Sequence, residues 1–93
     1  MKIYLTDPED NILENTEAIS VPFDISKARW LSHVGEYMCI RYSFPLFGEA
    51  SIAISRDFEN YLALFVINGL ETYCRLQLNY IEKEILKNFL KKY

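Results

Sequence analysis

The Asn68-Gly69 pair limits what this chain can fold into more than any other feature. It separates two runs of alternating hydrophobicity, residues 61–67 and 70–78. A two-residue Asn-Gly link between such runs predicts a β-hairpin, because a type I′ turn needs a positive φ at both of its central residues. The length of the turn also sets the strand register, so it predicts which side chains share a face of the sheet.

The hairpin register divides the side chains into two faces. On the first face Ala63 opposes Cys74, and the other opposed residues are apolar or aromatic except Thr72, so this face is expected to be the core. The opposed pairs on the reverse face are Leu62 with Arg75, Leu64 with Tyr73 and Val66 with Glu71.

Leu62, Leu64 and Val66 on the reverse face need a cover. An antiparallel sheet with one side in water normally places polar residues on that side, and large exposed apolar patches are uncommon on monomers. Two kinds of cover are open. One is another part of this chain, either the first predicted helix or residues 14–23. The other is a partner protein or a second copy of the chain.

The remaining strands follow from alternation. Residues 37–44 and 50–55 alternate and predict two strands before the hairpin. Residues 2–6 predict an N-terminal strand that joins an edge of the sheet, and residues 12–13 are expected to pair back onto it. The predicted fold class is α+β, an antiparallel meander of about four to five strands with a short helix in the N-terminal half and a C-terminal helix. Residues 1–93 form a single domain.

Both helices are predicted from caps and periodicity. The first begins at Asp24 or Ser26 as N-cap, runs through Val34 and stops at Gly35. Its apolar stripe is formed by Ile25, Ala28, Leu31 and Val34.

The C-terminal helix has the stronger signals. Asn79 is its N-cap, and Glu82 stands three residues later, which is the spacing of a capping box. Its apolar stripe consists of Ile81, Ile85, Phe89 and Tyr93, widened by Leu86 and Leu90.

The charge is uneven along the chain. The net charge is −3, yet residues 1–24 hold six acidic residues against Lys2 alone. A concentrated negative field disfavours nucleic acid as a direct partner and favours a basic protein surface.

The sequence offers no chemistry of a recognisable kind. His33 is the single histidine, so a two-histidine metal site is excluded. A calcium loop counted from Asp7 would place Ile12 and Ala18 where such a loop needs Gly and Glu. We therefore expect no catalytic residue, no metal and no cofactor, and a protein that is not an enzyme.

Location and redox state follow from short patterns. The longest apolar run, residues 61–67, is too short to span a bilayer, so no membrane association is expected. Cys39 and Cys74 are expected to be free thiols, with Cys74 a small buried residue. Both observations favour a cytoplasmic protein.

These patterns favour a small acidic binding protein that occludes or inhibits a partner protein. Immunity proteins, antitoxins and phage-encoded inhibitors are of this physical kind, and the partner would be a basic toxin or nuclease. The alternative is a homodimeric structural or accessory subunit whose two-fold interface includes Leu62, Leu64 and Val66. The expected partner-binding residues are Asp7, Glu9, Asp10, Glu14, Glu17, Asp24, Trp30, Leu62, Leu64, Val66 and Tyr73.

Overall fold

The computed structural model describes residues 1–14 and 16–93, and within them the chain forms a seven-stranded antiparallel sheet followed by an α-helix. The strand order is β2-β1-β7-β6-β5-β4-β3, so β3 to β7 form a meander and β1 is added beside β7. The elements are β1 (Lys2–Thr6), β2 (Ile19–Ser20), the 3-10 helix η1 (Ile25–Lys27), β3 (Ala28–Val34), β4 (Tyr37–Phe44), β5 (Gly48–Ser55), β6 (Tyr61–Ile67), β7 (Leu70–Gln77) and α1 (Tyr80–Leu90).

The predicted hairpin is confirmed as β6 and β7. Asn68 and Gly69 have φ values of 52° and 79°, as a type I′ turn requires. Ala63 opposes Cys74, and both are buried in the core. The register also places Leu62, Leu64 and Val66 on the reverse face, opposite Arg75, Tyr73 and Glu71.

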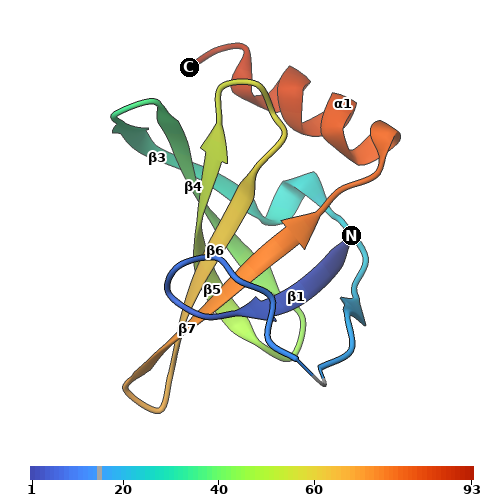
Figure 1. The fold of residues 1–93 in the computed structure, drawn as a ribbon. Helices are drawn as coiled ribbons and strands as arrows, with labels where there is room; N and C mark the ends of the chain where they lie inside the picture. The colour runs from blue at the N-terminus through green and yellow to red at the C-terminus, as the bar shows by residue number, and fades with distance from the viewer. Residues whose placement is uncertain (15) are drawn as a thin grey trace.

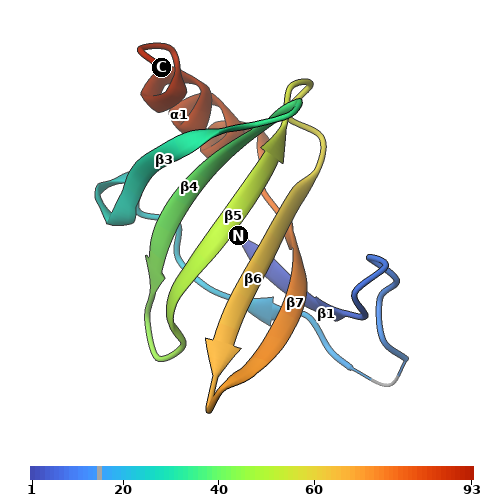
Figure 2. The ribbon, with the colours of Figure 1, turned by 90° about the vertical axis from the view of Figure 1, so that its left-hand side faces the viewer.

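The sheet is strongly curved, and α1 lies across one end of its concave side (Figures 1 and 2). The predicted capping box is present, because Asn79 accepts from the Glu82 backbone and Glu82 accepts from the Asn79 backbone. Leu86 and Leu90 of α1 are buried in the core. Ile81 is 68% exposed and Ile85 39%, so this part of the expected apolar stripe faces outward.

The predicted helix from Asp24 to Val34 is wrong. Asp24 does cap a turn of helix, but η1 ends at Lys27 and the chain continues as strand β3. β3 pairs with β4, and Gly35 adopts a positive φ of 59° in the two-residue turn between them. Ile25, Ala28, Leu31 and Val34 are three residues apart, which is a spacing typical of a helix. Pairing with β4, however, gives hydrogen-bond partners to backbone N–H and C=O groups along a whole strand. Tertiary pairing therefore overrides the local periodicity.

Both edges of the sheet are short or irregular. β2 has two residues, Ile19 and Ser20, and pairs with the start of β1. At the other edge the register between β3 and β4 shifts at Leu31, between Trp30 and Ser32, as in a β-bulge. The predicted return of residues 12–13 onto the first strand is confirmed, because Ile12 forms a bridge with Thr6.

The turn at Gly69 gives a direct test of the register. A Cβ at Gly69 would meet no atom within 4 Å, so Gly69→Ala changes only the backbone energy at a φ of 79°. We expect a loss of about 1–2 kcal/mol in the free energy of unfolding, measured by urea denaturation. Gly69→Asn should lose less, because asparagine tolerates the left-handed region. Equal urea midpoints for Gly69→Ala and the wild type would contradict the assigned turn.

Candidate functional site

The convex face of the sheet, on the side away from α1, carries Leu62, Leu64 and Val66. In the described residues neither expected cover lies there, because β3 replaces the first helix and Phe23 stacks on Tyr42 on the concave side. The β5 residues opposite Leu62 and Leu64 are the small Ala53 and Ser51, which cannot cover a leucine side chain fully. Leu62 and Leu64 are therefore only half-buried, and Val66 is 67% exposed.

The turn after β1 lies beside this face and projects from the sheet (Figure 2). Asp10 anchors it through Arg75, whose Nε and Nη2 donate to the Asp10 carboxylate at 3.1 and 2.9 Å. Asp7, Asp10, Leu62 and Tyr73 line one shallow hollow there, of about 50 Å³. The structure thus brings four of the expected partner-binding residues together, although they lie up to 66 positions apart in sequence.

Three of the six N-terminal acids hold local structure. Asp7 Oδ1 accepts from the backbone N–H groups of Glu9 and Asn11, both at 2.9 Å. The hydrogen bonds from Asn11 lower the pKa of the Asp7 carboxyl. Asp24 accepts from Ser26 in η1, which likewise lowers its pKa, and Asp10 is paired with Arg75.

The acids that remain for a partner are Glu9, Glu14 and Glu17. All three are exposed, and none forms an ion pair within the described part of the chain. They lie in or after the same turn. The negative charge still available to a partner is thus carried by these three glutamates, of which Glu9 lies in the turn beside the convex face.

Trp30 and Asp24 do not belong to this surface. Trp30 is half-buried against the core and stacks on Tyr93 with ring centroids 4.7 Å apart. His33 lies against the same group, with its Nε2 3.1 Å from the Tyr93 carbonyl oxygen. Asp24 donates its backbone N–H to the Tyr42 hydroxyl at 2.8 Å. Trp30 was expected among the partner-binding residues, but β3 places it against Tyr93 after α1, away from the acidic turn.

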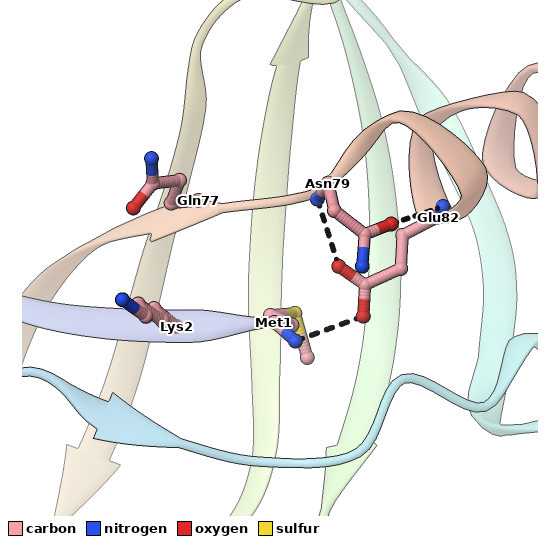
Figure 3. A pocket seen from close by; sticks show the side chains of 5 residues that line it. All are labelled: Met1, Lys2, Gln77, Asn79 and Glu82. Carbon is pink, nitrogen blue, oxygen red and sulfur yellow. Dashed lines mark hydrogen bonds and ion pairs between the residues drawn. The ribbon is translucent and has the colours of Figure 1, made fainter.

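The hollow shown in Figure 3 lies where β1 meets the start of α1, and its volume is about 240 Å³. Glu82 lines this hollow, and both oxygens of its carboxylate accept hydrogen bonds. Oε1 accepts from the Asn79 N–H at 2.9 Å, and Oε2 accepts from the Met1 amino group at 2.8 Å. This hollow is therefore a structural junction between the first strand and the helix.

An apolar groove at the end of the concave side far from α1 was not predicted. Its volume is about 260 Å³, and Ile3, Ile19, Phe47, Phe65 and Ile67 contribute most of its walls. It depends on β2 pairing with β1, which places Ile19 opposite Ile3. The one sequence signal for this groove was the pair Pro45-Leu46. Leu46 stands directly after a proline, at a turn position that glycine usually occupies.

Comparison of the chain with protein-family models, curated proteins and solved structures gives no match. Among the residues that the structure describes, no group of three or more His, Cys, Asp or Glu is placed to hold a metal ion. The same residues include no helix with the length and apolar character needed to cross a membrane.

The two cysteines are not joined to each other. Cys74 is buried, and burial raises the pKa of its thiol to about 11. Burial also raises the pKa of the half-buried Cys39. Thiols of this kind stay protonated near neutral pH and are weak nucleophiles. The expectation of Cys74 as a small buried residue is confirmed.

Asp7 should make stability depend on pH in a defined direction. Its folded pKa lies below the ordinary value of 3.8, so its contribution is full above that value and is lost as the pH falls through the folded pKa. Asp7→Asn cannot ionise, so the free energy of unfolding should fall less between about pH 5 and about pH 3 than in the wild type. Glu9→Gln in the same turn should keep the wild-type fall. Identical pH profiles for Asp7→Asn and the wild type would refute this role.

Glu82 should matter more to stability than an exposed glutamate. Its side chain is 13% exposed and pairs with the Met1 amino group, which is 1% exposed. Glu82→Gln should lower the free energy of unfolding by about 1–2 kcal/mol, because it removes a charge-assisted bond at a buried junction. Glu84→Gln is the control, since its pair with Lys87 is exposed and should contribute less than about 0.5 kcal/mol. Equal losses in urea unfolding would contradict this difference.

Proposed function

We propose that this chain is a small cytoplasmic binding protein that occludes a partner protein with a basic surface. Immunity proteins, antitoxins and phage-encoded inhibitors act in this physical manner. The observation that carries the proposal is the convex face, where exposed Val66 and half-buried Leu62 and Leu64 lie beside an anchored acidic turn. The two unpaired cysteines support a reducing compartment.

The apolar part of the surface supplies the affinity. Burying a large aliphatic side chain contributes about 1.5–3 kcal/mol, and Val66 is 67% exposed. Tyr73 lies between these residues and the acidic turn, opposite Leu64. Its hydroxyl donates to Glu71 at 2.7 Å, which raises the pKa of Tyr73 and holds its ring in place. An ordered tyrosine beside aliphatic residues is typical of the centre of a protein interface.

The charges supply the orientation. Glu9, Glu14 and Glu17 lie on the β1 side, whereas Arg29 and Arg41 oppose each other on β3 and β4 at the other side of the sheet. A basic partner is therefore attracted to the side that carries the acidic turn. Attraction of this type raises the association rate and weakens as salt is added.

The test is capture of partners by tagged protein from native lysate, followed by kinetics with the purified partner. Replacement of Glu9, Glu14 and Glu17 by lysine should lower the association rate about tenfold or more at low salt. Glu36→Lys, an exposed acid in the β3–β4 turn, is the matched control and should have little effect. Val66→Asp should raise the dissociation rate about tenfold.

Two results would contradict the proposal. One is a partner whose binding is insensitive to salt and to both sets of variants. The other is a solution mass of twice 11.0 kDa that Val66→Asp restores to the monomer value. The second result would favour the homodimeric subunit with the convex face as its two-fold interface.

A further inference from the structure

The end of the molecule opposite α1 is apolar and open. The β4–β5 turn and the β6–β7 turn both lie at this end (Figures 1 and 2). Between them and β1 runs the groove of about 260 Å³, whose lining is apolar apart from Thr72. Phe65 and Cys74 at its floor are buried, whereas Ile67 at its rim is 42% exposed. The core is therefore sealed by α1 at one end and left accessible at the other.

Leu46 stands beside this groove in an unfavourable backbone conformation. It is 101% exposed, and it follows Pro45 with a φ of 71°. In a turn with proline at the second position, a positive φ at the third favours glycine, and a leucine there is strained. Its neighbour Phe47 lines the groove. A fully exposed leucine in a strained turn does not stabilise the folded monomer. Backbone strain of this kind is often found at binding surfaces.

We infer that this end is a self-association surface, on which Leu46 of each copy enters the groove of the other. A projecting side chain and a receiving groove on the same end are self-complementary, which is what a two-fold dimer requires. The inference is independent of the proposed function, because it uses the concave side of the sheet. It also differs from the alternative with Leu62 and Val66 at the interface, since those residues lie on the convex face.

The exposed apolar area is about what a weak dimer needs. Together the rim side chains expose as much as about three fully exposed large residues, or roughly 500 Å² per copy. A specific interface needs about 1,000 Å² in total, so two copies reach the lower limit and the dissociation constant should be micromolar. The rim residues and their exposures are Ile19 37%, Leu46 101%, Phe47 37%, Ile67 42% and Leu70 72%.

Charge has no part in the contact itself, because the groove is lined by apolar residues apart from Thr72. Added salt screens the attraction between exposed charges, but it does not weaken the burial of apolar surface. The dimer should therefore be at least as tight when the salt concentration is raised. Binding of a basic partner under the proposed function changes in the opposite direction.

The test is sedimentation equilibrium from low micromolar to submillimolar concentration, at low and high salt. The wild type should pass from 11.0 kDa to twice that mass, with a dissociation constant that does not rise at high salt. Leu46→Gly relieves the strained turn, so it should fold at least as stably while its dissociation constant rises at least tenfold. Leu70→Glu should also prevent association. Val66→Asp, on the convex face, is the control that should still dimerise.

Three results would overturn the inference. They are a wild type that stays monomeric at every concentration, a Leu46→Gly variant that dimerises like the wild type, and a dimer that only Val66→Asp disrupts. Circular dichroism and urea unfolding of each variant are the controls for correct folding. A monomeric wild type that still binds a basic partner would refute self-association alone and leave the proposed function standing.

Discussion

The pairing of β1 with β7 is the interaction on which the rest of the structure depends. It places Ile3 opposite Leu76 and Leu5 opposite Cys74, and so extends the apolar face of the hairpin by one strand. The same pairing brings the Met1 amino group to Glu82 at the start of α1. It also places Asp10 of the acidic turn next to Arg75. In addition, it brings Ile3 into the wall of the groove that Phe65 also lines. Two candidate surfaces and one junction thus follow from a single five-residue strand.

A sheet of this size has two faces, but one short helix can cover only part of one. α1 buries Leu86 and Leu90, and the segment at Phe23 and η1 completes the concave side. The convex face is then protected only by its own side chains and by the acidic turn. The distribution of apolar residues follows from this geometry, since both the convex face and the open end retain aliphatic side chains that the described residues leave partly or fully exposed.

Much of the fold could be predicted from the sequence where local signals and tertiary pairing agree. Alternation placed β4 and β6 with their observed bounds, and Asn68-Gly69 set the register of β6 and β7. The strand β3 could not be found, because the spacing of Ile25, Ala28, Leu31 and Val34 suits a helix and only the free edge of β4 makes it a strand. The number of strands was accordingly too low.

The candidate site was predictable in part for the same reason. The hairpin register alone identified Leu62, Leu64 and Val66 as a row on the face away from the core. No local signal could show that Asp10 would form an ion pair with Arg75, 65 residues later, or that Trp30 would stack on Tyr93. The groove depends on contacts between β1, β2 and the β4–β5 turn, which are distant in sequence. Features that arise from one hairpin could be predicted from the sequence, whereas features that arise from three separate segments could not.

The two edges of the sheet have a consequence for how the protein behaves at high concentration. A long regular edge strand offers unpaired N–H and C=O groups on which further chains can add without limit. Here one edge is β2, with two residues, and the other is β3, whose register is broken at Leu31. Neither edge presents a long uninterrupted ladder. The exposed aliphatic residues are thus not accompanied by a long regular edge strand, and association of the two proposed kinds would use side-chain surfaces that can close.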